Sequence, residues 1–201
     1  MLSQPNNSSF RVPDRDFDGL TPLPGIEACP AKACEIPELA SLARERVPGV
    51  QLSAAELDIY CRLNPRTAFS FVRNGQLLGG IAFLFLNEDG LDALILDRIN
   101  LRLPPPSMLA APDDEPAAIY WWALVAKGRG VGGLGQIARV FAGAQYRHVD
   151  FYTQPSSRDG VRIITALGFE RTPSWQTDLW TYRRAANREA ARSEAHLRQA
   201  A

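Results

Sequence analysis

The stretch Gly128-Arg129-Gly130-Val131-Gly132-Gly133-Leu134-Gly135 decides the fold of this chain. Apolar and aromatic residues precede it at 119–122, and an amphipathic run follows it at 136–141. We interpret the three parts as a strand, a glycine loop and a helix. Glycine has no Cβ, so a ligand can approach the backbone closely, and amides at a helix N-terminus attract phosphate groups. The stretch therefore predicts a phosphate-binding turn.

Composition describes an ordinary globular chain. Its 201 residues fit one domain with a substantial core, and 46% of them are apolar. The 22 basic residues balance 22 acidic ones, so no net charge favours nucleic acid or an anionic membrane. The first ten residues are mostly polar and do not resemble a signal peptide, and no apolar run approaches the roughly 20 residues of a membrane span. We expect a cytoplasmic protein with neither nucleic acid nor membrane as partner.

The three cysteines argue against a disulfide framework and for a reducing compartment, because their number is odd. Cys29 and Cys34 are five positions apart, and the chain has only two histidines, His148 and His196. This set does not have the spacing of a zinc site, so we expect no metal.

The chain divides into three parts by composition. Residues 1–24 are rich in Asn, Ser and Pro and predict a flexible N-terminal arm. Residues 25–183 form the domain, and the Ala-rich, charged tail 184–201 is helical or disordered. In the domain, Ser53 and Glu56 form a capping box, and Asn74-Gly75 predicts a type I′ hairpin turn. The expected strands are 25–29, 67–73, 76–86, 118–125, 148–153, 169–171 and 177–183, and the expected helices are 37–47, 53–64, 91–99, 132–143 and about 162–167.

Two ligands fit the glycine loop. As GxGxxG it matches a Rossmann dinucleotide fingerprint twice, and Asp150 lies about where that site places its ribose-binding acid. Against this, only one strand–helix unit follows the loop, and the hairpin before it is antiparallel. A doubly wound parallel sheet is therefore the weaker interpretation. The other ligand is acyl-CoA.

Over about residues 25–183 the chain resembles the GNAT superfamily of acyl-CoA-dependent N-acyltransferases. The loop motif of that family is Arg or Gln, two residues, Gly, any residue, then Gly or Ala; residues 127–132 match it, with Lys127 in place of Arg or Gln. A second landmark, a helix ending in Leu-Gly-Phe before a strand, is present at 167–169. The resemblance implies an α/β (α+β) fold with a mixed, mostly antiparallel twisted sheet flanked by helices.

The resemblance also implies a reaction: transfer of an acyl group, most simply acetyl, from acetyl-CoA or another acyl-CoA to an amine acceptor of unknown identity. The loop amides would hold the CoA pyrophosphate, and the pantetheine arm would lie between the strand ending near Leu124 and the strand at Phe151-Tyr152. A backbone N–H near Leu124 would polarise the thioester carbonyl. The implied cofactor-binding residues are Leu124, Val125, Lys127, Gly128, Arg129, Gly130, Val131, Gly132 and Gly133.

The chain departs from the family where proton transfer is expected. The usual tyrosine acid, four residues before the Gly of Gly-Phe, is Ile164 here, and a common asparagine corresponds roughly to Ser157. Tyr152 is our candidate acid and Tyr120 our candidate base. The weaker candidates are Ser156, Ser157 and Asp159 for the acid, and Glu88 and Asp89 for the base. A non-catalytic GNAT-like module that binds CoA or a protein stays open as the alternative.

Residues 87–117 are an insertion relative to the short turn that joins these two strands in the family. The sequence leaves two roles for it: a wall of the acceptor cleft, or a contact between the subunits of a homodimer.

Overall fold

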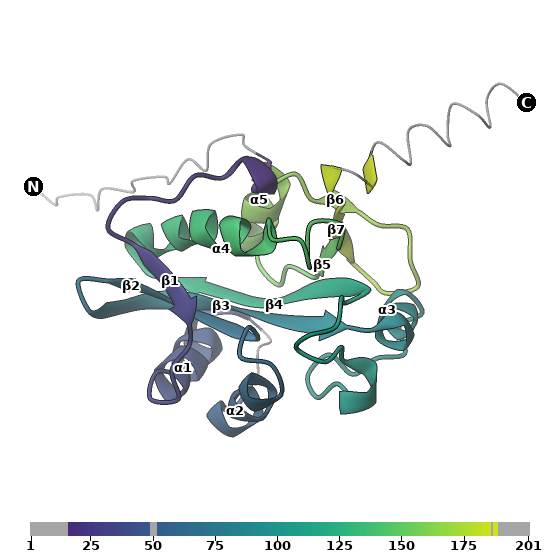
Figure 1. Ribbon diagram of the computed structural model, residues 1–201, viewed down its shortest axis with the longest axis horizontal. Coiled ribbons are helices and arrows are strands. Elements are labelled where there is room, and N and C mark those ends of the chain that lie inside the picture. Colours follow the sequence, from purple (N-terminus) through teal and green to yellow (C-terminus); the bar gives the residue numbers. More distant parts are fainter. Residues whose placement is uncertain (1–15, 49–51, 186, 189–201) are drawn as a thin grey trace, which may run out of the picture.

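The computed structural model describes residues 16–48, 52–185 and 187–188. They form one seven-stranded sheet with the order β1-β2-β3-β4-β5-β7-β6, and helices cover both faces (Figure 1). The strands are β1 (Glu27–Pro30), β2 (Ala68–Arg73), β3 (Gln76–Leu86), β4 (Ala118–Ala126), β5 (Phe151–Thr153), β6 (Glu170–Arg171) and β7 (Trp180–Tyr182). The helices are α1 (Ile36–Arg46), α2 (Ala54–Leu63), α3 (Glu88–Ile95), α4 (Leu134–Phe141) and α5 (Arg158–Ala166), with 3₁₀ turns η1 (Phe17–Gly19), η2 (Pro106–Met108) and η3 (Gly128–Gly133).

Among the strand pairs of the described residues, only β4 and β5 run parallel. The predicted fold class, a mixed and mostly antiparallel sheet flanked by helices, is confirmed. The Rossmann interpretation is wrong, because a dinucleotide site needs a parallel, doubly wound sheet. Asp150, its candidate ribose acid, instead accepts hydrogen bonds from the Arg184 amide and the Asn187 side chain, both at 2.8 Å.

Two local sequence signals produce the structures they predict. Asn74 and Gly75 have φ values of 50° and 76°, as a type I′ turn requires, and the flanking strands pair in the hairpin register. At the start of α2, the Ser53 hydroxyl accepts from the Glu56 amide at 3.1 Å, and the Glu56 carboxylate accepts from the Ser53 amide at 2.7 Å. These hydrogen bonds lower the pKa of Glu56.

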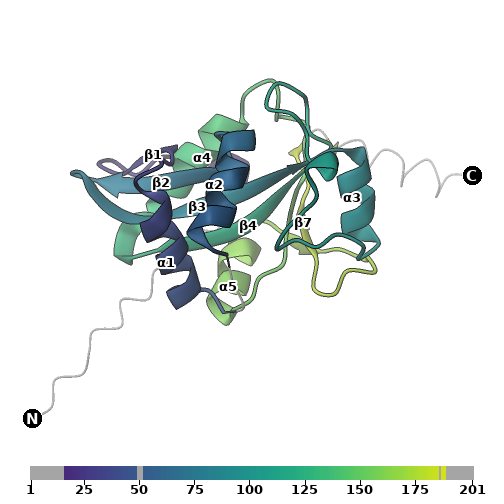
Figure 2. The same ribbon diagram turned by 90° about the horizontal axis from the view of Figure 1, so that it is seen from below.

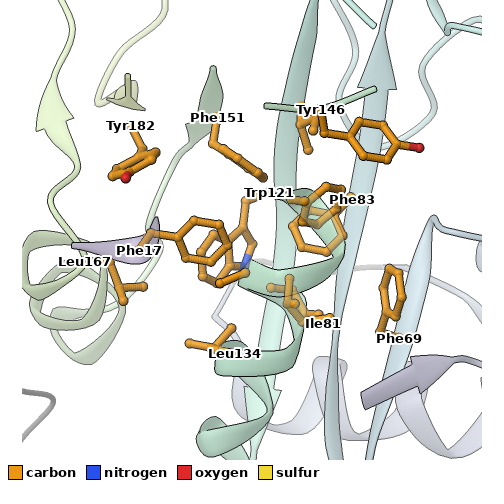
Figure 3. Packing of buried hydrophobic residues seen from close by; sticks show 14 of the residues in the cluster. Phe17, Phe69, Ile81, Phe83, Trp121, Leu134, Tyr146, Phe151, Leu167 and Tyr182 are labelled. Atoms are coloured by element: carbon orange, nitrogen blue, oxygen red, sulfur yellow. The ribbon is translucent and has the colours of Figure 1, made fainter. Parts of the chain in front are cut away.

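The larger core lies between the sheet and helices α4 and α5, and aromatic rings dominate it (Figure 3). Phe83 and Phe85 of β3 point to this side, whereas Leu84 and Leu86 point to the opposite face, under α2 and α3. The central strand is therefore buried on both faces, which explains why its sequence is apolar at consecutive positions.

The inserted residues 87–117 pack on the second face of the sheet, on the same side as α1 and α2 (Figure 2). Leu94 and Ile99 are buried there beside Tyr60, whose hydroxyl donates to the Pro104 carbonyl at 3.1 Å. The insertion is also joined to the sheet through the Ala110 amide, which donates to a β3 carbonyl at 2.9 Å. The insertion therefore belongs to the body of the domain on this face.

The chain ends are described in part. Of the predicted arm, residues 16–24 are described, and Phe17 among them is completely buried. Of the predicted tail, only residues 184, 185, 187 and 188 are described, and Arg184 is 3% exposed. The boundaries at residues 24 and 184 stay predictions. No helix among the described residues is long and apolar enough to cross a membrane.

Candidate functional site

Strands β4 and β5 separate at the end of the sheet that carries the glycine stretch. Within the described residues, β5 pairs with β4 only from Ile119 to Trp121, and β4 continues to Ala126. The Thr153 hydroxyl donates to the Trp121 carbonyl at 3.1 Å and marks the last link between the two strands. The backbone of residues 122–126 therefore has a β-strand partner on one side only.

A β-bulge lies at the point where the strands part. Phe83 is opposite Trp121 whereas Ala82 is opposite Ala123, so Trp122 is an extra residue in β4. The bulge places Trp122 and Ala123 on the same face, under α1 and α2. The Trp122 ring meets the Tyr60 ring edge-on at 5.4 Å. We did not predict this bulge, since a pair of tryptophans gives no local signal for one.

The register gives the direction of the Leu124 amide. The Phe83 amide donates to Thr67 at 2.6 Å, toward β2, and alternation along β3 directs the Ile81 amide the same way. Leu124 lies opposite Ile81, in a pair that exchanges no hydrogen bonds, so its N–H points away from β3. That is the side on which β5 has ended. The neighbouring Val125 is buried, opposite Gly80.

The glycine stretch forms the 3₁₀ turn η3, and α4 continues from it without a break. Its first i→i+3 bond runs from the Gly130 amide to the Lys127 carbonyl, at 2.9 Å. The amides of Gly128 and Arg129 come before this bond and have no partner within the turn. Lys127, Gly128 and Arg129 are all exposed. The exposed start of the turn therefore presents two amides without a partner in the turn, next to two cationic side chains.

The other glycines are explained by packing within the chain. A Cβ on Gly133 would fall within the van der Waals radii of the Phe71 ring, and one on Gly132 would lie 2.8 Å from the Leu23 side chain. At Gly130 it would press on Leu78 at 3.0 Å. Only at Gly128, with φ of 54°, is the space around the Cβ position open.

The two candidate tyrosines are neighbours on one face of the sheet. Tyr120 of β4 is paired with Tyr152 of β5, on the face covered by α2 and the insertion. Tyr120 is buried, and its hydroxyl donates to the Gln154 side chain at 3.2 Å. Burial raises the pKa of Tyr120, so its hydroxyl keeps its proton at neutral pH, and its role as a base stays a prediction. Gln154 was missed from the sequence, since nothing there links it to Tyr120.

Tyr152 is half-buried, and its pKa is raised, first by burial and then by the charge of Asp150. It too is protonated at neutral pH, which suits the predicted role of proton donor. Ile164, at the position of the family's tyrosine, is buried in the larger core. The Ser157 hydroxyl is engaged as the N-cap of α5, where it accepts from the Gly160 amide at 3.0 Å.

In the part of the chain that the structure describes, no group of three or more His, Cys, Asp or Glu side chains could hold a metal ion.

No protein-family model matches the chain, and no curated protein is similar to it in sequence. Among solved structures, it is similar to the loading GNATL domain of CurA from Lyngbya majuscula, with a TM-score of 0.56 and 12% identity over 79% of this chain and 97% of that one. Two weaker similarities carry no argument. A GNAT family acetyltransferase from Brucella melitensis in complex with acetyl-CoA gives 0.46, with 15% identity over 79% and 87%. The GphF GNAT-like decarboxylase in complex with isobutyryl-CoA gives 0.46, with 15% identity over 70% and 71%.

Proposed function

We propose that this chain, which has the GNAT fold, transfers an acyl group from acyl-CoA to an amine. The observation that carries the proposal is the gap beside β4. There the Leu124 N–H points to the side that β5 leaves free, and β4 leads directly into the exposed start of the glycine turn. Acyl-CoA carries a thioester carbonyl and a pyrophosphate, joined by pantetheine. In this proposal the Leu124 N–H binds the carbonyl and the start of the glycine turn binds the pyrophosphate, at the same end of the sheet.

In this proposal the donor lies along β4. The pyrophosphate accepts hydrogen bonds from the free amides of Gly128 and Arg129, and the cationic side chains of Lys127 and Arg129 balance its charge. The dipole of α4 adds to this attraction. The pantetheine follows residues 122–126, and the Leu124 N–H donates to the thioester oxygen, where negative charge develops during attack.

The chemistry is a substitution at the thioester carbon. The acceptor nitrogen forms a bond to this carbon, the carbon–sulfur bond breaks, and the CoA thiolate takes up a proton. Tyr152 is the proposed donor of that proton, with Tyr120 and Gln154 beside it. The ammonium proton of the acceptor leaves through water before attack. The proton that the nitrogen loses after attack passes through water and restores the Tyr152 hydroxyl.

The insertion and Tyr60 lie on the same face as Tyr120 and Tyr152, so in this proposal the acceptor approaches from that side. We propose acetyl as the acyl group because it is the simplest one. The amine acceptor is to be identified with a panel of candidate amines. A cytoplasmic location also belongs to the proposal; it fits three free cysteines, of which Cys29 and Cys34 are exposed.

One observation favours a second function, a non-catalytic module that binds CoA. Ile164 fills the position of the family's acid with a buried apolar side chain. Two measurements separate the alternatives: calorimetry with acetyl-CoA, and release of free thiol across a panel of small amines, peptides and lysine derivatives. Binding with turnover supports the transferase, and binding without turnover for every acceptor supports the module. An absence of binding at millimolar acetyl-CoA would refute both.

A further inference from the structure

Residues 16–26, which we call the arm, lie against the first turn of α4. A Cβ on Gly135 would fall within the van der Waals radii of the Thr21 carbonyl and 2.7 Å from the Pro22 nitrogen. A Cβ on Gly132 would lie 2.8 Å from Leu23. Neither glycine needs an unusual φ. Both are therefore explained by the close approach of the arm, which runs over α4 from α5 to β1 (Figure 1).

The arm is anchored in the core at its start. Phe17 is 0% exposed and packs edge-on against Phe151 at 5.1 Å and Tyr182 at 5.7 Å (Figure 3). Its amide donates to the Leu167 carbonyl at the end of α5, at 3.0 Å. Burial of the phenylalanine ring therefore stabilises this docked position.

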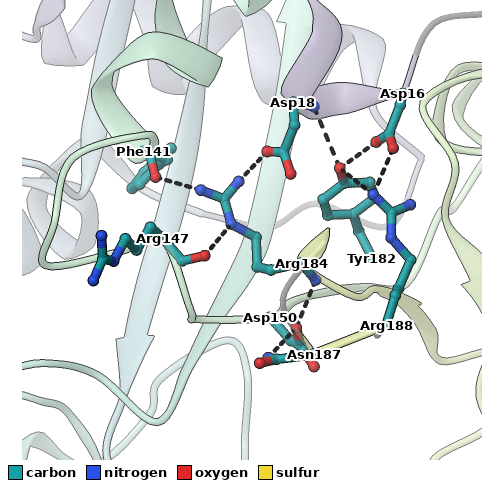
Figure 4. A network of polar contacts seen from close by, with 9 residues as sticks. All are labelled: Asp16, Asp18, Phe141, Arg147, Asp150, Tyr182, Arg184, Asn187 and Arg188. Carbon is teal, nitrogen blue, oxygen red and sulfur yellow. Dashed lines mark hydrogen bonds and ion pairs between the residues drawn. The ribbon is translucent and has the colours of Figure 1, made fainter. Parts of the chain in front are cut away.

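Charged groups fix the same end (Figure 4). The Tyr182 hydroxyl donates to the Asp16 carboxylate, and Arg188 pairs with the same carboxylate at 2.6 Å. Asp18 pairs with Arg184, the guanidinium of which is almost completely buried. The start of the arm is thus bound to the last residue of β7 and to residues that follow this strand.

Arg184 also connects the arm to α4. Its guanidinium donates to the Phe141 carbonyl at 2.6 Å, at the last residue of the helix, and to the Arg147 carbonyl at 3.2 Å. The Asp18 carboxylate balances the charge of this buried guanidinium, and the two carbonyls accept hydrogen bonds from its remaining N–H groups. The C-terminal end of α4 and the start of the arm therefore share one anchor.

Gln136 binds the other end of the arm to the first turn of α4. Its side-chain amide donates to the Ile26 carbonyl and its oxygen accepts from the Ala28 amide, both at 2.6 Å. One side chain therefore pairs with the outer edge of β1 as a neighbouring strand would. Leu23 in turn packs against Gly132. The N-terminal part of the chain therefore contacts the first turn of α4 at Gln136 and the residues just before it at Gly132.

We propose that the arm is a positioning segment of the donor site, and that acyl-CoA binds tightly only when the arm is docked. The inference rests on the proposed function. The arm lies behind the turn and does not cover it: it contacts Gly132 and Gly135, whereas the space beside Gly128 is open and Lys127 and Arg129 are exposed. Release of the arm would leave the glycine turn to be ordered by the ligand itself, which weakens binding.

The test uses Gly135→Ala, which places a methyl group against Thr21 and Pro22 while improving the helix propensity of α4. Gly143→Ala, just beyond the end of the same helix, is the matched control, because its Cβ would only reach the Val140 carbonyl at 3.4 Å. Phe17→Ala releases the arm from its other anchor. Hydrogen exchange of the residue-17 amide reports docking, and calorimetry measures the affinity for acetyl-CoA.

We expect Gly135→Ala and Phe17→Ala to speed exchange of this amide and to weaken acetyl-CoA binding about tenfold, as for a loop that loses its preorganisation. Gly143→Ala should change neither. Unchanged or tighter binding with a released arm would overturn the inference and leave the proposed function intact. Weaker binding with the arm still docked would also overturn it, as would a Gly135→Ala protein equal to wild type in both measurements. If wild type itself binds no acetyl-CoA, the proposed function fails, and the inference fails with it.

Discussion

The Leu124 amide offers the sharpest test of the proposed chemistry. Leu124→Pro removes its N–H, and because that N–H points away from β3 the substitution breaks no bond of the β3–β4 ladder. Loss of one donor to a developing oxyanion costs about 10²–10³ in kcat, or about 2.7–4 kcal/mol. We therefore expect kcat to fall by this factor while the affinity for acetyl-CoA changes little.

Two controls separate the amide from the side chain and the strand. Leu124→Ala keeps the N–H and loses the same half-buried packing, so it should lower stability about as much as proline does and keep activity. Val125→Pro removes an amide that points toward β3, opposite Gly80, and should destabilise the sheet more than Leu124→Pro does, because a hydrogen bond of the ladder is lost.

Thiol release with the best amine of the panel measures kcat, and urea unfolding measures stability. Independently of turnover, the amide NMR signal of Leu124 should shift with acetyl-CoA and not with CoA, which lacks the carbonyl. A Leu124→Pro enzyme as active as Leu124→Ala, or a signal that responds equally to both ligands, would refute the assignment.

Three further outcomes follow from burial and hydrogen bonding. Tyr152→Phe should lower kcat about 10²–10⁴-fold with little change in the KM for acetyl-CoA, as thiol-release kinetics would record; an unchanged kcat would dismiss it as the acid. Phe17→Ala should lower the free energy of unfolding in urea by about 3–5 kcal/mol, because its ring is completely buried, whereas a change below about 1 kcal/mol would contradict the docked arm. Burial raises the pKa of all five tyrosines. A raised pKa stabilises the folded state fully below about pH 10, the unfolded value, and this contribution is lost as the pH rises above it. The last part of the rise in phenolate absorbance, from the most perturbed tyrosines Tyr120 and Tyr182, should therefore coincide with loss of circular dichroism.

Local chemistry could be predicted from the sequence because its partners are close in the chain. The capping box at Ser53 and the turn at Asn74-Gly75 each depend on residues within three positions, and both are present. Gly168 ends its helix with φ of 87°, as a C-cap glycine should. The order of such elements, together with two short motifs, was enough to predict the sheet and its helices.

Contacts between distant residues could not be predicted in this way. Arg184 stands at the start of an Ala-rich, charged tail, a composition typical of solvent-exposed segments, yet its guanidinium is buried against Asp18, 166 positions away. The hydrogen bond between Tyr120 and Gln154 joins β4 to the loop that follows β5. It forms because β4 and β5 are parallel neighbours, which the sequence around either residue does not reveal. The bulge at Trp122 results from the pairing of β3 and β4, to which residues far apart contribute.

The glycine stretch predicted the fold correctly, but it assigned more residues to the ligand site than the structure supports. Its glycines suggested a ligand because each was expected to let a phosphate approach the backbone. In the structure, Gly133 admits a core ring, and Gly132 and Gly135 admit the arm. The proposed phosphate site is thereby reduced to the amides of Gly128 and Arg129, at the exposed start of the turn. The same absence of a Cβ thus serves chain packing at one end of the stretch and ligand access at the other, so a glycine substitution tests direct contact with the donor only where the side chain would meet open space.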